Sequence, residues 1–396
     1  MMDHADIVIA GGGPVGGALA LALKDGGRSV TVLEARGDFS RQRDPRALAL
    51  SYGGMLILRR LGIWDRLPAP TPITAIHVSR KGGLGRCLLS ADADGLPALG
   101  YVADYDVLDR ALREALAGGG VHYLTGAAVT RTRTASGYAV VDFLQHGAAR
   151  QLTTRLLARA DGGRGDDAVP GSGQQVRDYG QSAVVAPVRS ELPHRNVAYE
   201  RFTGEGPLAL LPSGDGLALV WTCAPERARR LCAMAEPDFL AALHGHFGDR
   251  LGRFTAAGPR AAFPLVLKYA RPVVAQRTVL LGNAAQTLHP VAGQGFNLGL
   301  RDAWELAAEI LATPPGEIGG RAMLERYRAG RRLDSAGSIL FTDTLARLFS
   351  NDDPILRHGL GLGLMALEGL LPAKRFVARR MMFGARGCRW RAPTSM

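Results

Sequence analysis

Short apolar runs bounded by glycines form the pattern at the start of the chain. Residues 6–10, Asp-Ile-Val-Ile-Ala, are typical of a short buried strand, and a glycine-rich turn follows them directly. Residues 14–24 begin with proline and are rich in small and apolar side chains, which predicts a tightly packed helix. A second strand is predicted at 29–33. The chain therefore opens with strand, turn, helix and strand.

The same kind of pattern returns late in the chain. Residues 278–281 predict another short apolar strand, and residues 297–312 predict a helix after a glycine-rich loop. Between the two regions, the alternating stretches 208–211 and 217–222 are typical of antiparallel strands. The pattern predicts an α/β domain interrupted by a mostly β region.

The first glycine-rich turn has the spacing of a dinucleotide-binding site. Gly11 allows the tight turn, Gly13 lets the backbone approach a pyrophosphate, and Gly16 lets helix and strand pack closely. Pro14 begins the helix, and Glu34 ends the second strand at the distance expected for a ribose-binding carboxylate. An ordinary glycine turn is the alternative, and the complete register of strand, helix and acidic residue disfavours it.

The second glycine-rich segment predicts contacts to the far end of a long cofactor. Asn283 follows the strand at 278–281, where its amide can bond ribityl hydroxyls, and the loop that begins at His289 leads into the next helix. The positive end of that helix would favour an anionic reduced flavin. A nicotinamide site is normally completed within one βαβ unit, so the two distant segments together favour FAD. The candidate contacts in the loop and helix start are Pro290, Gly293, Gly295 and Asn297.

Composition is consistent with this interpretation. The 396 residues include 47% hydrophobic and 21% charged side chains, as in globular proteins. The four cysteines form no metal-ligand or disulfide pattern, so we expect no metal and a cytoplasmic location. The N-terminus lacks a signal-peptide pattern, and no apolar stretch approaches the roughly 20 residues of a membrane span.

The net charge of +12 is concentrated near the C-terminus. No acidic residue follows Glu368, whereas seven basic residues alternate with apolar ones. This segment is either a solvated basic tail or an amphipathic surface that binds anionic lipid or an acidic partner, such as the inner face of the membrane. No nucleic-acid-binding motif accompanies the charge, so we expect no nucleic-acid partner. The basic residues are Lys374, Arg375, Arg379, Arg380, Arg386, Arg389 and Arg391.

Almost the whole chain resembles the FAD-dependent aromatic hydroxylases of the para-hydroxybenzoate hydroxylase type. It is similar to their ubiquinone-biosynthesis branch, and most of all to the 2-polyprenyl-6-methoxyphenol hydroxylases. The segments that carry the resemblance are the first glycine motif, 46–51, 61–64, 160–162, 200–203, 206–212 and 282–302.

The resemblance implies a Rossmann-type FAD-binding domain interrupted by a mostly β substrate domain, with C-terminal helices. The expected FAD-binding parts are 1–70, 101–180 and 271–335. The expected parts of the substrate domain are 71–100 and 181–270, and a C-terminal helical basic segment is expected at 336–396.

Further FAD contacts are implied by the same resemblance. Arg46 and Arg110 would lie near the ribose and phosphates, and Asp161 and Asp302 near the ribityl chain and flavin. The segment around Asp161 departs from the family pattern, and Tyr105 stands where some relatives place a glutamine that contacts FAD.

The implied activity is hydroxylation of a polyprenylated phenol in ubiquinone biosynthesis, through reduced flavin and a C4a-hydroperoxide. It would use O2 with NAD(P)H or another electron donor, and its implied partners are a biosynthetic protein assembly and the membrane surface. Two alternatives remain open: a reductase or dehydrogenase of a prenyl lipid, and a non-catalytic flavin-binding subunit. No catalytic residue is assigned. His289 is either an acid/base group or a structural support, and Tyr199, Trp221 and Phe263 line a substrate pocket or belong to the core.

Overall fold

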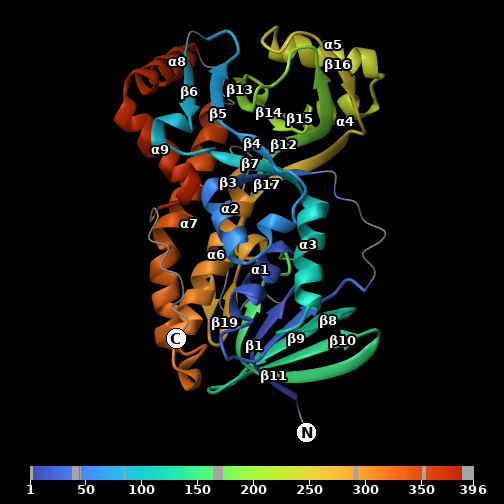
Figure 1. Ribbon diagram of the computed structural model, residues 1–396, viewed down its shortest axis with the longest axis vertical. Helices are drawn as coiled ribbons and strands as arrows, with labels where there is room; N and C mark the ends of the chain where they lie inside the picture. Colours follow the sequence, from blue (N-terminus) through green and yellow to red (C-terminus); the bar gives the residue numbers. More distant parts are fainter. Residues whose placement is uncertain are drawn as a thin grey trace.

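The computed structural model describes residues 3–37, 44, 46–83, 85–163, 173–288, 293–349 and 354–385, without the side chains of 345–349 and 354–358. Figure 1 shows two stacked parts, a lower α/β part and an upper part built mainly of strands. The predicted fold class is confirmed, because a parallel sheet with helices is interrupted by an antiparallel-rich sheet domain and followed by C-terminal helices.

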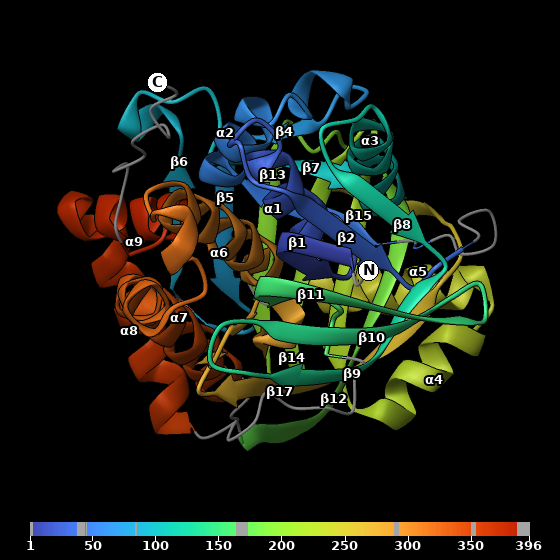
Figure 2. The ribbon, with the colours of Figure 1, turned by 90° about the horizontal axis from the view of Figure 1, so that it is seen from below.

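The lower sheet has a parallel centre in the order β19-β11-β1-β2-β8. Its strands are β1 (Asp3–Ala10), β2 (Val30–Glu34), β8 (His122–Thr125), β11 (Ala148–Arg159) and β19 (Thr278–Leu280). Three strands extend it by antiparallel pairing, namely β9 (Ala127–Thr134), β10 (Ala139–Gln145) and β18 (Val274–Ala275). Figure 2 shows β9, β10 and β11 side by side at this edge of the sheet.

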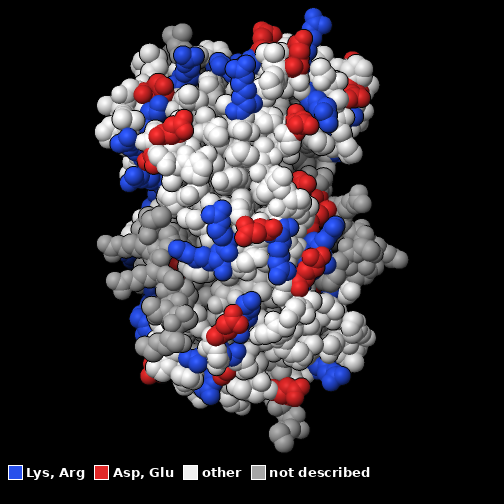
Figure 3. Space-filling view, viewed as in Figure 1, with Lys and Arg blue, Asp and Glu red and all other residues white. Residues whose placement is uncertain are grey.

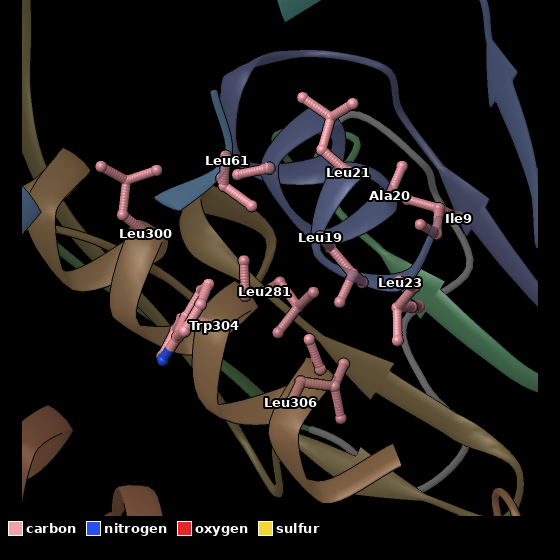
Figure 4. Close-up of a cluster of buried hydrophobic side chains, with 14 of the residues drawn as sticks. Ile9, Leu19, Ala20, Leu21, Leu23, Leu61, Leu281, Leu300, Trp304 and Leu306 are labelled. Atoms are coloured by element: carbon pink, nitrogen blue, oxygen red, sulfur yellow. The ribbon is translucent and has the colours of Figure 1, made fainter. Parts of the chain in front are cut away.

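Apolar side chains alternate between the two faces of the parallel strands, so each face has its own core. Ile7 and Ile9 of β1 lie in the cluster formed with the helices, whereas Val8 lies in a second cluster with Phe143 of β10. The helices on the first face are α1 (Pro14–Leu23), α3 (Tyr105–Ala117) and α6 (Gln294–Leu311). Figure 4 shows how α1 and α6 interlock through leucines such as Leu19 and Leu306.

The upper sheet has nine strands, eight of them in the order β20-β17-β12-β15-β14-β13-β5-β6, with β16 paired to β12. The predicted antiparallel strands are confirmed, since β14 and β15 pair as a hairpin. The strands are β5 (Ala75–Arg80), β6 (Arg86–Ser90), β12 (Gly173–Ser190), β13 (Val197–Thr203), β14 (Gly206–Ser213), β15 (Gly216–Cys223), β16 (Phe254–Ala257), β17 (Ala261–Arg271) and β20 (Gln286–Thr287).

Helices α4 (Pro225–Ala233) and α5 (Glu236–Phe247) cover the outer face of the upper sheet and enclose Trp221 in a core. A small third sheet of β3 (Ala47–Ser51), β7 (Gly100–Asp104) and β4 (Thr71–Ile73) lies between the two parts. The remaining helices are α2 (Tyr52–Arg60), α7 (Arg321–Phe349), α8 (Pro354–Gly369) and α9 (Leu371–Phe383).

Both sheets draw on segments that are distant in sequence. The domain boundary expected after residue 180 falls inside β12, and the one expected after 335 falls inside α7, so these elements belong to both neighbouring parts. The expected basic C-terminal segment contains α8 and α9, which pack against β6 and α2 at the side of the upper part. In the described part of the chain, no helix has the length and apolar character needed to cross a membrane.

Candidate functional site

The glycines of the first motif are of two kinds. Two of them lie so close to other protein atoms that a side chain would overlap those atoms, and the third faces open space. Gly11 has φ +102°, and a Cβ there would lie 2.5 Å from the carbonyl oxygen of Ala160. A Cβ on Gly16 would lie 2.0 Å from the carbonyl oxygen of Gly11. Gly13 differs, because a Cβ there would meet nothing within 4 Å and the residue lines a large cavity. Gly11 and Gly16 are therefore required for the close packing of the turn. Gly13, which has no side chain, leaves the adjacent part of the cavity open.

The N-terminus of α1 offers an anion site to this cavity. Gly13 is the N-cap, Pro14 is at the first turn, and no side chain caps the helix. The amide groups at a helix start and the positive end of the helix dipole attract phosphate oxygens. Because Gly13 and Pro14 line the cavity, a pyrophosphate fits the position that the sequence predicted for it.

Glu34 stands at the carboxyl end of β2, beside the same turn. Its carboxylate accepts hydrogen bonds from the backbone N–H of Gly12 at 2.7 Å and from Nε of Arg36 at 2.8 Å. Arg36 also lies 3.5 Å from Asp109 of α3. These contacts fix Glu34 at the cavity wall, where remaining carboxylate lone pairs can accept ribose hydroxyls.

Two arginines expected near the phosphates also line the cavity. The hydrogen bond and charge of Asp44 raise the pKa of Arg46, whose guanidinium lies 5.4 Å from the ring of Tyr105 and 5.6 Å from that of Phe263. Arg110 is exposed on α3, and no carboxylate among the described residues pairs with it. Arg46, which is held by Asp44, and Arg110, which has no carboxylate partner among the described residues, are thus both available to bind a phosphate.

Asp161 and Asn283 follow the carboxyl ends of the paired strands β11 and β19. The Asp161 carboxylate accepts hydrogen bonds from Nε of Arg159 at 3.0 Å and from the N–H of Gly163 at 3.0 Å. Asn283 is exposed just after β19, and both residues line the cavity. The unusual Asp161 segment therefore still presents a carboxylate beside the position of the expected ribityl chain.

The end of the second glycine-rich segment, at the start of α6, lines the cavity with Gly293 and Gly295. Gly293, with φ +60°, is the N-cap without a side-chain cap, and a Cβ there would lie 2.8 Å from that of Ala49. A Cβ on Gly295 would meet no atom within 4 Å, and this residue lines the cavity. Pro290 and His289 lie outside the described residues. The helix start and Gly295 leave room for a flat ring next to backbone amides.

Asn297 joins the start of α6 to β3. Its side-chain amide donates hydrogen bonds to the carbonyl oxygens of Ala49 and Gly293, both at 2.8 Å, and its oxygen accepts from the N–H of Ser51 at 2.8 Å. Both amide hydrogens and the amide oxygen are thereby used within the protein. Asn297 therefore supports the start of α6, and its predicted contact with FAD stays a prediction.

Replacing Asn297 with aspartate is expected to destabilise the apoprotein by about 3 kcal/mol, because two carbonyl oxygens lose their donor and face a carboxylate. Urea unfolding followed by tryptophan fluorescence measures the change. Asn283→Asp is the matched control, since Asn283 is exposed, and its apoprotein should stay within about 0.5 kcal/mol of wild type. Equal unfolding midpoints for both variants would contradict the supporting role of Asn297.

Asp302 lies on the buried side of α6, where it belongs to an ion network. Its carboxylate accepts hydrogen bonds from Nε of Arg331 at 2.8 Å and from Nε2 of Gln286 at 2.8 Å. Arg331 also donates to Asp334 at 2.8 Å, and Asp334 accepts from Nε of Arg301 at 2.7 Å. The four charged side chains are 2–3% exposed, and Asp302 is not among the residues that form the cavity wall. This position gives Asp302 a role in joining α6 to α7.

One cavity of about 2290 Å³ connects the wall residues described above. Pockets for small molecules commonly measure roughly 300–1,000 Å³, so this cavity is large enough for a dinucleotide and a second molecule. Its upper half, here called the apolar chamber, lies beneath the upper sheet and reaches α8 and α9. Apolar side chains of that chamber include Val78, Val185, Ala209, Val220, Leu364 and Met381.

Of the aromatic residues considered from the sequence, Phe263 and Tyr199 line the cavity, whereas Trp221 is fully buried against α4 and α5. The ring of Tyr199 packs against that of Phe247 at 5.5 Å, on the side of the same core. Glu200, for which no role was predicted from the sequence, lines the apolar chamber. Strand alternation contained the signal, since Ala198, Glu200 and Phe202 share one face of β13.

Comparisons with known proteins identify a family for the chain. A family described as "FAD binding domain" matches residues 4–339. The ubiquinone hydroxylase UbiL of Rhodospirillum rubrum is 36% identical over 390 residues, which cover 96% of this chain and 89% of that protein. The 3-demethoxyubiquinol 3-hydroxylase of Escherichia coli is 34% identical over 380 residues, covering 92% and 94%.

Among solved structures, the p-nitrophenol 4-monooxygenase PnpA of Pseudomonas putida DLL-E4 is similar with a TM-score of 0.77. The alignment covers 98% of this chain and 100% of that one, at 19% sequence identity. At this identity the likeness supports the fold alone.

Proposed function

The chain belongs to the FAD-binding domain family that includes the ubiquinone hydroxylases, and on that premise we propose that it hydroxylates the aromatic ring of a polyprenylated phenol in ubiquinone biosynthesis. It is an FAD-dependent monooxygenase that uses NAD(P)H and O2. The observation that carries the substrate assignment is the continuity of the cavity, which runs from the two glycine motifs into the apolar chamber. An aromatic head group can lie beside the cofactor while an apolar tail extends beneath the upper sheet.

The residues present fit FAD, and each part of the site has a separate task. The N-terminus of α1 and Arg110 bind the pyrophosphate, while Glu34 accepts hydrogen bonds from the adenosine ribose. Asp161 and Asn283 hold the ribityl chain, and the start of α6 stabilises negative charge on the ring. When bound, FAD transfers electrons from NAD(P)H to O2 and supplies the electrophilic oxygen.

The apolar chamber contributes orientation and exclusion of water. Its valine, alanine and leucine side chains cannot solvate a charged oxygen species, so they disfavour its loss as hydrogen peroxide. They also hold the ring and tail in one position, which lowers the entropic cost of bringing the reacting atoms together. The net reaction converts a ring C–H, O2, NAD(P)H and a proton into a ring C–OH, NAD(P)+ and water.

The direct test is turnover of the purified protein with FAD, NAD(P)H, O2 and a short-tailed 2-prenylphenol. We expect the phenol to stimulate NAD(P)H oxidation and mass spectrometry to find one oxygen atom from isotope-labelled dioxygen in the product. Reduced product without added oxygen would instead identify a reductase. Equal NAD(P)H oxidation with and without the phenol, with no oxygenated product, would contradict the proposed function.

A peripheral contact with anionic membrane lipid is part of this proposal, because a polyprenylated phenol must be collected from an apolar phase. Helices α8 and α9 expose large apolar side chains next to cations, and their buried sides reach the apolar chamber. We call this the α8–α9 surface, formed by Leu362, Met365, Leu370, Leu371, Arg375 and Phe376. On the face seen in Figure 3, acidic and basic side chains are interspersed rather than gathered in a single basic patch.

Replacing Leu371 and Phe376 with serine and Arg375 with glutamate is expected to reduce binding to anionic vesicles at least about 10-fold. Leu371 is 48% exposed and Phe376 is 70% exposed, so the change removes lipid-facing groups without opening the core. Each cation near anionic lipid contributes about 1 kcal/mol, and salt screens that attraction. Vesicle flotation at low and high salt measures the binding.

Neutral vesicles and an Arg328→Glu variant are the controls, because Arg328 is an exposed cation on α7 outside this surface. The result against lipid docking would be the same recovery of wild type and triple variant with anionic and neutral vesicles. In that case the enzyme would receive its lipid substrate from a biosynthetic protein assembly instead.

A further inference from the structure

One acidic side chain stands within a row of apolar side chains in the wall of the chamber. Glu200 lies on β13, and its register neighbours are Ala209 on β14 and Val78 on β5. The row continues from Ala209 to Val220 of β15 and then to Val185 of β12. Register partners share a face of the sheet, and all five residues line the cavity. Glu200 is therefore a carboxylate set in a row of valines and alanine.

The carboxylate of Glu200 has no protein partner among the described residues, since no hydrogen bond or ion pair reaches it there. The side chain is half-buried, and it faces the cavity. Burial away from water raises its pKa to about 7. An unpaired carboxylate in an apolar wall costs stability, and groups of this kind are concentrated at functional sites.

Other charged and titratable groups lie on the elements around this part of the wall: His77 and Arg80 on β5, Cys87 on β6, Arg189 on β12 and Asp215 in the turn between β14 and β15. His77 is in register with Tyr199, on the opposite face of β5 from Val78, and burial lowers its pKa below the usual value. On the neighbouring β6, burial raises the pKa of Cys87 to about 11. Arg80 of β5 is in register with Phe202, and Arg46 approaches from the lower part of the cavity. Both guanidinium groups keep their proton throughout the accessible pH range. A pH effect near neutrality in the chamber is therefore attributed to Glu200.

We propose that Glu200 is a catalytic base that accepts the proton of the substrate's ring hydroxyl during hydroxylation. The proposal rests on the proposed function, because it requires a phenol in the apolar chamber. A phenol hydroxyl is a hydrogen-bond donor, and Glu200 supplies the acceptor that the surrounding valines and alanine lack. The same contact would place the ring with its hydroxyl toward β13 and its reacting carbon toward the lower part of the cavity.

The proton transfer balances with the proposed reaction. As a ring carbon forms its bond to the incoming oxygen, the O–O bond to that oxygen breaks, and the second oxygen leaves with the electron pair and takes up protons to become the water of the net reaction. At the same time electron density moves from the hydroxyl oxygen into the ring and the O–H bond breaks. The proton passes to a carboxylate oxygen of Glu200. When the ring carbon loses its own hydrogen as a proton to water, the ring becomes aromatic again and Glu200 returns its proton to the oxygen. A base with a pKa close to the working pH suits both directions of this transfer.

The first measurement is the pH dependence of product formation by the FAD-loaded enzyme with 2-prenylphenol. Wild-type turnover should rise as pH increases through about 7, because only the ionised Glu200 accepts the proton. Glu200→Gln should lower turnover roughly 100-fold and abolish that pH dependence. FAD affinity and the rate of flavin reduction by NAD(P)H should remain unchanged. Glu317→Gln, at an exposed glutamate outside the cavity, is the matched control.

The second measurement detects contact between Glu200 and a phenol without turnover. The probe is 4-nitrophenol, whose ionised form is yellow, bound to the oxidised holoenzyme. An adjacent carboxylate disfavours a second negative charge, so Glu200→Gln should lower the pKa of the bound probe by about 1 or more. More of the bound probe should then be yellow at neutral pH in the variant than in wild type or Glu317→Gln.

These two readouts separate the inference from the function on which it rests. The same probe pKa in wild type and Glu200→Gln would overturn the role of Glu200, whatever the turnover. Unchanged turnover and pH profile in the variant would also overturn it. A Glu200-dependent probe pKa in a wild type that forms no oxygenated product would instead reject hydroxylation and support contact between Glu200 and a phenol.

Discussion

Gly13→Val is expected to yield a folded protein that no longer retains FAD. The Gly13 backbone has φ −67° and ψ −178°, which valine readily adopts, and a side chain there meets no protein atom within 4 Å. The valine would enter the cavity at the N-terminus of α1 and block the approach of the pyrophosphate. Losing two charge-assisted hydrogen bonds of about 1.5 kcal/mol each corresponds to roughly a 100-fold loss of affinity. Titration of the apoprotein with FAD, followed by flavin fluorescence, measures this loss.

Two other glycines provide controls for this result. Gly245→Val on α5 also places a side chain in open space but lies outside the cavity wall, so FAD affinity should be unchanged. Gly11→Val should fail to fold, because its φ is +102° and its Cβ would overlap the backbone of Ala160. If Gly13→Val bound FAD as tightly as wild type, the pyrophosphate site would lie elsewhere.

Arg331→Met is expected to destabilise the protein by about 3–5 kcal/mol, because it leaves buried carboxylates without their shared cation. Arg331 is 3% exposed and bonds Asp302, Asp334 and Glu305. Such a loss is a large part of the roughly 5–15 kcal/mol that typically separates folded from unfolded protein. Urea unfolding at neutral pH measures the effect, and Arg331→Lys, which keeps the charge but not the planar fork, should lie between wild type and Met.

The pH dependence of this effect has a defined sign. Burial alone would raise the pKa of Asp334, but Arg301 and Arg331 lower it to about 2, so the stability that Asp334 contributes in wild type is lost only as pH falls toward 2. Without Arg331, the carboxylates bind protons at higher pH. The penalty in Arg331→Met should therefore shrink as pH falls.

The control for the ion network lies one turn away on the same helix. Arg328 is 52% exposed and pairs with Glu325, so Arg328→Met should change the free energy of unfolding by less than about 0.5 kcal/mol. Similar destabilisation by the Arg328 and Arg331 changes would show that the buried network contributes nothing specific.

Local pattern was sufficient to predict the elements that build the cofactor site. The first strand, turn and helix and the later antiparallel strands were found close to their predicted positions, because each has a strong period and clear glycine or proline boundaries. The start of α6 differed: it begins at Gln294 rather than Asn297, because Gly293 adopts a left-handed conformation and serves as the N-cap. A single glycine conformation of this kind is not visible in the sequence.

Side-chain partners between distant segments could not be predicted in the same way. The resemblance placed Asp302 near the flavin, but its position depends on Arg331, which lies on the next helix. Glu200 belongs to segment 200–203, one of those that carry the family resemblance. Its proposed role, however, depends on its having Val78 and Ala209 as neighbours. Both features arise from the packing of elements, which periodicity within one element does not specify.

The strand order of the lower sheet also determines when the site can form during synthesis. β1 pairs with β11, and β11 pairs with β19, so an early strand waits for partners encoded far later. At roughly 5–20 residues per second, the ribosome needs on the order of tens of seconds to make the intervening chain. One edge of β1 stays unpaired until β11 is made, and the next edge, on β11, stays unpaired until β19 is made, so the complete cofactor site cannot form before then. We therefore expect chaperones to bind the nascent N-terminal segment. We also expect a shortage of FAD to affect completed chains rather than chains that are still being synthesised.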